Sequence, residues 1–246
     1  MLVSFSGGAP EALNAAVHAL DRHLQDNGFY GFVEAVPGMA SLLVYYDPRL
    51  IGFGDVVRRL QERQRRAGVT ASRPRRVWVV PVWYGGEAGP DLAYVAGQTR
   101  LDEERVVTLH AARTYVVYFI GFMAGFPYMG PLDPALDVPR RAVPRVHVPA
   151  GSVAIAAGQT GIYPLAGPGG WHVIGRTPVP VWDAARTPPA LFAPGDAVRF
   201  RPITSEEFCR LAATPDGGVL ADAGGGCPDG GDDPAEASDQ PVGAGG

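Results

Sequence analysis

Lysine is absent from this chain of 246 residues, and all 21 of its cationic side chains are arginine. The chain therefore has no Schiff-base lysine, no lysine general base and no P-loop lysine. Any phosphate or carboxylate bound here must be held by arginine, backbone N–H groups, hydroxyls or a metal ion. Biotin cannot be attached to this chain either, because that modification needs a lysine.

Cysteine and histidine are scarce. The two cysteines, Cys209 and Cys227, provide neither a disulfide framework nor a metal-binding spacing. The five histidines show no H-x-x-H or H-E-x-x-H spacing, so no zinc site is expected. A reducing compartment, the cytoplasm, is the expected location.

Long apolar runs and excess positive charge are also missing. No apolar run reaches the roughly 18 residues of a membrane span, and no secretory pattern opens the chain. We therefore expect no membrane partner. The net charge of −4 argues against nucleic acid, because neutralising phosphates needs a basic excess.

Residues 1–80 show the order β-α-β-β-α-β, which is typical of the ferredoxin-like split motif. A helical spacing of apolar residues marks 9–24, and an arginine-rich amphipathic pattern marks 56–67. Extended runs lie at 2–5, 29–36, 41–46 and 77–81. The last of these is expected to be the fourth strand of that domain.

Residues 81–211 have a different texture. Two short helices are expected first, and Thr99 to Asp102 have the form of a capping box for the second. Short β-branched runs separated by glycine and proline then predict a barrel or sandwich. Residues 212–246 are mostly Gly, Asp, Ala and Pro and are expected to be a disordered acidic tail.

Several short motifs follow one another along the chain. Residues 121–130 read G-F-M-A-G-F-P-Y-M-G, and further motifs lie at 81–84, 89–92, 110, 139–145, 148–153, 158–164, 168–171, 174–178 and 194–200. In this order they resemble the family of KipI and allophanate hydrolase subunit 1, whose signature is G-F-x-P-G-F-P-Y-L-G. Met123-Ala124-Gly125 departs from the usual x-Pro-Gly, which predicts a less rigid turn.

The resemblance implies an α+β protein with a ferredoxin-like N-terminal domain followed by a cyclophilin-like β-barrel. It also implies one subunit of an ATP-dependent 5-oxoprolinase, which opens 5-oxoproline to glutamate. ATP would be the co-substrate, and a requirement for metal stays open. The implied partners are a sister cyclophilin-like protein, the C subunit of 5-oxoprolinase, and a LamB-type A subunit. Two alternatives are an inhibitor of a sensor histidine kinase and a carboxyltransferase component of urea breakdown, which would need a biotin carrier on a partner.

The chemistry calls for cations and oriented donors, because phosphoryl transfer to a lactam oxygen is catalysed mainly by positioning and charge stabilisation. Arg140, Arg141 and Arg145 lie between prolines and suit bidentate carboxylate or phosphate contacts. Alternatively, they pair with Asp133 and Asp137 and brace their loop.

Five other side chains are candidates. Gln159, between glycines, offers a donor and an acceptor to a lactam, or it is a turn residue. Tyr163 and Trp171 are pocket walls or barrel core, and the neighbouring His172 is expected to be exposed. His110 is a candidate general base or a structural histidine. Arg176 binds ligand or forms a surface ion pair.

Overall fold

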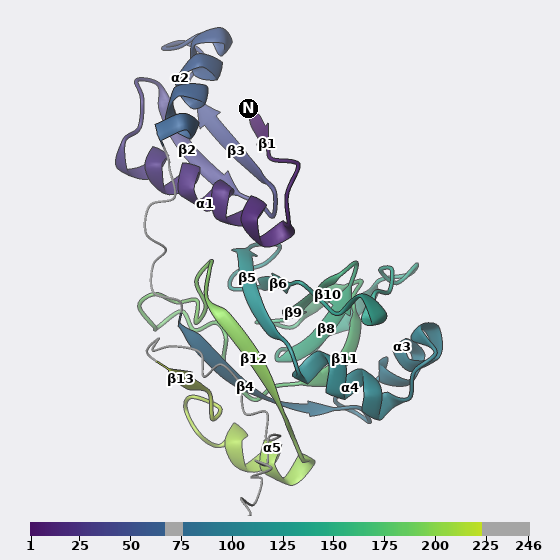
Figure 1. The fold of residues 1–246 in the computed structure, drawn as a ribbon. Coiled ribbons are helices and arrows are strands. Elements are labelled where there is room, and N and C mark those ends of the chain that lie inside the picture. Colours follow the sequence, from purple (N-terminus) through teal and green to yellow (C-terminus); the bar gives the residue numbers. More distant parts are fainter. Residues whose placement is uncertain (67–75, 223–246) are drawn as a thin grey trace, which may run out of the picture.

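The computed structural model describes residues 1–66 and 76–222, which form an N-terminal α/β unit and a β-barrel (Figure 1). The fold class is α+β. All structural statements below refer to these residues.

The N-terminal unit is a three-stranded antiparallel sheet with two helices. Its strand order is β1-β3-β2, with bounds Leu2–Ser4, Ser41–Tyr46 and Phe32–Pro37. The helices are α1 (Pro10–Asp26) and α2 (Phe53–Arg66). Both helices pack against the same buried cluster, which includes Val17, Leu42 and Val56. The i, i+3, i+7 spacing of the apolar residues in α1 places them on one buried face.

The barrel is a closed sheet. Seven strands follow one another in the order β11-β8-β9-β6-β5-β12-β4, and β4 pairs again with β11 within the described residues. Their bounds are β4 Val77–Tyr84, β5 Thr114–Ile120, β6 Pro127–Gly130, β8 Ser152–Ala156, β9 Gln159–Ile162, β11 His172–Arg176 and β12 Ala197–Ile203. This architecture is consistent with the expected cyclophilin-like barrel.

Strand β4 corrects one expectation from the sequence. The run at 77–81 was expected to complete a ferredoxin-like sheet, but β4 pairs in parallel with β12 over seven residue pairs. The N-terminal sheet therefore has three described strands, and the ferredoxin-like domain is not confirmed. The expected boundary at residue 80 lies inside β4. Periodicity alone identifies a strand and not its partner, because pairing is decided by packing of distant residues.

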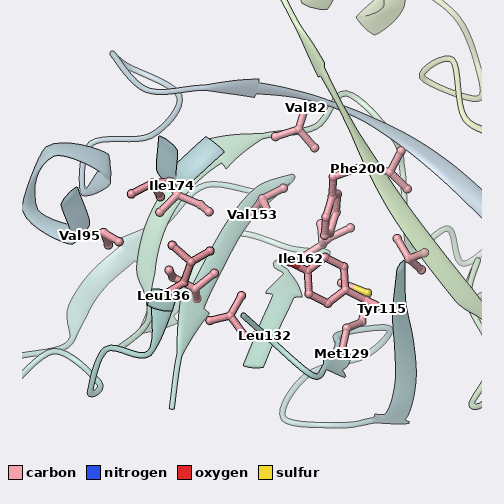
Figure 2. Packing of buried hydrophobic residues seen from close by; sticks show 14 of the residues in the cluster. Val82, Val95, Tyr115, Met129, Leu132, Leu136, Val153, Ile162, Ile174 and Phe200 are labelled. Atoms are coloured by element: carbon pink, nitrogen blue, oxygen red, sulfur yellow. The ribbon is translucent and has the colours of Figure 1, made fainter. Parts of the chain in front are cut away.

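The barrel interior is filled by apolar side chains. Figure 2 shows Val82, Tyr115, Val153, Ile162 and Phe200, from five different strands, pointing toward one another. Burying an aliphatic or aromatic side chain of this kind contributes about 1.5–3 kcal/mol. The interior is therefore packed core, and a ligand must bind at its rim or on its outside.

Smaller elements cover the barrel. Helix α3 (Leu92–Thr99) and helix α4 (Glu103–Ala111) precede β5, and α5 (Ser205–Ala212) follows β12. Asp102, and not Thr99, caps α4, since its side chain accepts from the Arg105 N–H at 2.6 Å. The Thr99 hydroxyl instead donates to the Val95 carbonyl within α3. A 3-10 turn, η1 (Pro134–Leu136), and a two-stranded ribbon, β7 (Arg145–Val148) with β10 (Gly167–Gly169), complete this region.

The start of the expected tail is ordered. Strand β13 (Leu220–Asp222) pairs with β4, so residues 212–222 belong to the folded molecule. The remainder of the expected tail, 223–246, lies outside the described residues. Among the described helices, none has the length and apolar character needed to span a membrane.

Candidate functional site

A pocket of about 160 Å³ lies on the barrel beside the β5–β6 loop. We call it the aromatic pocket. It is formed by β6 and by four loop segments, those between β5 and β6, η1 and β7, β9 and β10, and β10 and β11. It is lined by Phe122, Phe126, Tyr128, Arg140, Arg141, Pro144, Tyr163, Gly170 and Trp171. Four of the residues expected at the site, Arg140, Arg141, Tyr163 and Trp171, therefore lie together.

The β5–β6 loop places Phe122 at the pocket. The loop is held by backbone bonds from Gly121 N–H to Phe126 O and from Phe126 N–H to Met123 O, both 3.1 Å. Phe122 has a φ of +66° and is 61% exposed. Holding a non-glycine residue in this left-handed region costs free energy, and such strain is often found at ligand sites. The Met123-Ala124-Gly125 turn is thus closed by backbone hydrogen bonds.

The aromatic walls of the pocket brace one another. The Phe126 ring packs edge-on against Tyr163 at 5.1 Å and against Trp171 at 5.6 Å between centroids. Tyr128 also meets Trp171 edge-on at 5.6 Å. Edge-to-face geometry is favoured by the ring quadrupoles. Tyr163 and Trp171 are buried and also line the pocket, so each belongs both to the core and to the pocket wall. The two alternatives considered from the sequence therefore both apply.

A glycine makes room for the Tyr163 ring. A Cβ atom on Gly169 would overlap the Tyr163 phenol oxygen and its neighbouring ring carbons. Burial raises the pKa of Tyr163, and burial also raises the pKa of Tyr128. Both phenols therefore stay protonated at neutral pH and can donate hydrogen bonds.

Asp91 anchors two of the three expected arginines. Arg145 binds its carboxylate with both terminal nitrogens, at 2.5 and 2.8 Å, and Arg141 Nη1 donates to it at 2.9 Å. The Val173 N–H donates to Asp91 Oδ2 at 2.7 Å. The expected acid partners Asp133 and Asp137 are not used: Asp133 binds Arg113 instead.

Asp91 is ionised despite its burial. Burial alone would raise the pKa of Asp91, but hydrogen bonds from Arg145 and Val173 and the charges of both arginines outweigh it, so the pKa lies below 3.8. A buried carboxylate held this way fixes the arginines in place, because releasing either one would leave charge uncompensated.

Arg140 differs from its two neighbours. It is exposed, and within the described chain its guanidinium forms no hydrogen bond or ion pair. Arg140 lines the pocket together with Tyr128 and Tyr163, and its charge acts to lower the pKa values of both phenols. The pocket thus offers one uncommitted cation beside two phenol donors.

His110 lies in the barrel core and does not line the pocket. Thr160 Oγ1 donates to the Ala154 carbonyl, so His110 Nε2 donates to Thr160 Oγ1 at 2.9 Å. The Tyr84 hydroxyl then donates to Nδ1 at 2.8 Å. Burial lowers the pKa of His110 to about 3. This environment favours the structural role over that of a general base.

Gln159 and Arg176 also lie outside the pocket lining. Gln159 follows a two-residue turn, Ala157-Gly158, with φ values of +49° and +73°. Its Nε2 donates to Met39 Sδ at 3.1 Å, across to the N-terminal unit. Arg176 Nε donates to the Ala150 carbonyl at 3.1 Å, and its guanidinium lies 5.9 Å from the Phe208 ring centre.

Sequence reasoning missed several residues of this site. Asp91 was part of a recognised motif, but nothing in the sequence places it beside arginines fifty residues away. Phe122, Phe126 and Tyr128 were in the signature and could have been found as its aromatic positions. His172 is buried rather than exposed, with Nε2 donating to the Pro139 carbonyl at 2.9 Å and its ring stacked on Tyr94.

The described residues offer little for a bound metal. No group of three or more His, Cys, Asp or Glu side chains suited to an ion is found in 1–66 and 76–222. The pocket residues instead suit an anion with an apolar body: guanidinium, phenol and aromatic faces.

A model of the family described as carboxyltransferase domain, subdomain C and D, matches residues 1–192. The chain belongs to this family. The whole aromatic pocket lies within the matched range, whereas β12, which closes the barrel, lies beyond it.

Named relatives cover most of the chain. This chain is 38% identical over 218 residues to the B subunit of 5-oxoprolinase from Bacillus subtilis, and the match covers 85% of this chain and 91% of that protein. It is 48% identical over 171 residues to the B subunit of 5-oxoprolinase from Escherichia coli O157:H7, covering 69% and 78%. The crystal structure of Kluyveromyces lactis urea carboxylase shares the fold, with a TM-score of 0.75 at 20% identity over 90% of this chain and 23% of that one.

Proposed function

We propose that this chain is one subunit of a cytoplasmic, ATP-dependent 5-oxoprolinase, which converts 5-oxoproline, ATP and two water molecules into glutamate, ADP and phosphate. The observation that carries the proposal is the similarity to proteins named as the B subunit of 5-oxoprolinase, at 38% and 48% identity. The likeness to urea carboxylase is at 20% identity and concerns the fold alone.

The aromatic pocket suits a role in holding a substrate. A lactam is unreactive until its oxygen becomes a leaving group, and phosphorylation by ATP achieves this. Catalysis of that transfer depends on position and on charge stabilisation. Arg140 and Arg141 supply positive charge, Tyr128 and Tyr163 supply neutral donors, and Trp171 supplies an apolar wall.

The pocket lacks a proton acceptor suited to neutral pH among the described residues. Its lining contains no histidine and no carboxylate, while His110, with a pKa of about 3, is enclosed in the barrel core. We therefore infer that partner subunits complete the catalytic apparatus. The proposed partners are the sister cyclophilin-like protein and the LamB-type protein, so this chain is expected to be inactive alone.

The test is reconstitution of the assembly. The chain is co-expressed with these two partners, and glutamate release from 5-oxo-L-proline is measured with and without ATP. We expect release only when ATP and all three chains are present, with the assembly lacking this chain as the control. A folded, complete assembly that releases no glutamate contradicts the proposal and favours a carboxyltransferase role, which needs a biotin carrier on a partner.

A further inference from the structure

We propose that the aromatic pocket binds a small ring that carries one carboxylate, and that the nucleotide binds elsewhere. The inference rests on the proposed function, under which the ring is 5-oxo-L-proline. It assigns the pocket to one of the two co-substrates, which the proposed function leaves open.

The first argument is size. The pocket holds about 160 Å³, and a cavity of roughly 150 Å³ accommodates a benzene ring. A five-membered lactam with one carboxylate is of this order. A purine joined to a ribose and three phosphates is far larger and would leave most of its surface outside the pocket.

The second argument is charge. Arg140 and Arg141 line the pocket, and Arg141 and its neighbour Arg145 bind one buried carboxylate, Asp91. Arg145 commits both terminal nitrogens to Asp91, whereas Arg141 commits one. Arg141 Nη2 and the whole Arg140 guanidinium are left without an acceptor among the described residues. This supply matches one carboxylate, and a triphosphate would need several more cations or a metal ion.

The third argument is the arrangement of apolar and donor groups. Trp171 and Phe126 meet edge-on and present a rigid wall for a flat ring. Tyr128 and Tyr163 remain protonated, so a phenol can donate to a lactam carbonyl. A buried Asp91 behind the arginines keeps Arg141 in one orientation before the ligand arrives, which lowers the entropy cost of binding.

The experiment is titration calorimetry of the full chain, and of the co-expressed assembly, with three probes: 5-oxo-L-proline, pyrrolidin-2-one and ATP. We expect 5-oxo-L-proline to bind and pyrrolidin-2-one, which lacks the carboxylate, to bind at least about tenfold more weakly. ATP is expected not to displace the bound ring.

Arg140→Gln is the diagnostic variant, because Arg140 is exposed and its replacement breaks no hydrogen bond or ion pair within the described residues. We expect it to weaken 5-oxo-L-proline at least about tenfold and to leave pyrrolidin-2-one unchanged. Arg199→Gln is the matched control, since Arg199 is an exposed arginine of β12 outside the pocket lining. Unchanged affinity in Arg140→Gln, displacement by ATP, or no binding to either the chain or the assembly overturns the inference.

Kinetics of the assembly separate this inference from the proposed function. In Arg140→Gln we expect KM for 5-oxo-L-proline to rise and KM for ATP to stay the same. Active wild-type assembly with an unaltered KM in the variant removes the pocket assignment and leaves the function standing. Arg140-dependent binding of the ring by an assembly that releases no glutamate removes the function and leaves the ligand class standing.

Discussion

At the scale of single residues, His110 is a motif residue whose surroundings indicate a structural role. Its ring is enclosed between Tyr84 and Thr160 and stacks on Phe200 at 4.7 Å between centroids. Both ring nitrogens are satisfied in the neutral form, so protonation would break the bond from Tyr84 and bury a charge.

This environment predicts a pH dependence of stability. The folded pKa of His110 is about 3, against an ordinary value of 6.5. Below pH 6.5, His110 therefore takes up a proton in the unfolded chain but not in the folded chain. The free energy of unfolding decreases accordingly as the pH falls toward 3. Between about pH 7.5 and pH 5.5 this group lowers the free energy of unfolding by about 1.4 kcal/mol.

Urea unfolding at those two pH values, with His110→Gln beside the wild type, isolates the contribution. The variant is expected to lose about 1.4 kcal/mol less on acidification. His18 and His172, whose pKa values burial also lowers, act equally in both proteins. An equal loss in both proteins would assign the acid sensitivity to other groups.

The residues of the pocket were only partly predictable. Arg140, Arg141, Tyr163 and Trp171 were named from residue type and motif, and they meet in the aromatic pocket. Gln159 and Arg176 have equally suitable side chains but lie outside its lining. Side-chain type indicates chemistry, whereas the direction in which a strand residue points depends on register and pairing.

At the scale of elements, the short ribbon β7–β10 controls the shape of the pocket. Gly169 of β10 lies against the Tyr163 ring, and the next two residues, Gly170 and Trp171, line the pocket. A side chain at residue 169 would have to displace the ring.

Gly169→Ala is therefore expected to destabilise the protein by about 1–3 kcal/mol through overpacking and to weaken ligand binding. Gly170→Ala is the matched control for stability, because its Cβ would meet Pro144 Cγ at an ordinary 3.7 Å. Thermal unfolding compares the two variants, and calorimetry compares ligand binding by Gly169→Ala with that of the wild type. Equal stability of the two would show that Tyr163 moves aside freely.

Element types were more predictable than their partners. The helices and strands of residues 1–66 follow the periodicity of the sequence closely. The sheet to which β4 belongs was not predictable from the sequence, because a buried strand has the same apolar pattern whichever sheet it joins. The cap of α4 was misplaced by three residues, since Thr99 and Asp102 are both good N-cap types.

At the scale of the whole molecule, Asn14 joins the two units. Its Nδ2 donates to the Met39 carbonyl at 3.0 Å and, across the interface, to the Tyr118 carbonyl of β5 at 3.1 Å. His18 Nε2 donates to the same Tyr118 carbonyl at 2.6 Å. Asn14 is 3% exposed, so its contacts are shielded from water.

Asn14→Leu is expected to cost about 1–3 kcal/mol, because buried carbonyls lose a donor. The lost hydrogen bond lies at the interface between the two units. Calorimetry is therefore expected to show the N-terminal unit unfolding in a separate transition at a lower temperature. Gln25→Leu, on the exposed face of the same helix, is the control. One unshifted transition in Asn14→Leu would mean that the interface is held by other contacts.

The parallel pairing of β4 with β12 has a consequence for synthesis on the ribosome. These are the first and last strands of the barrel, and residues 197–203 leave the ribosome long after 77–84. The N-terminal unit, whose described strands and helices all lie within residues 1–66, can fold while the rest of the chain is still being made. The barrel cannot close until β12 emerges, and until then the edges of β4 and β5 are open to pairing with other chains. Premature termination before residue 197 is therefore expected to yield aggregation rather than a smaller folded protein.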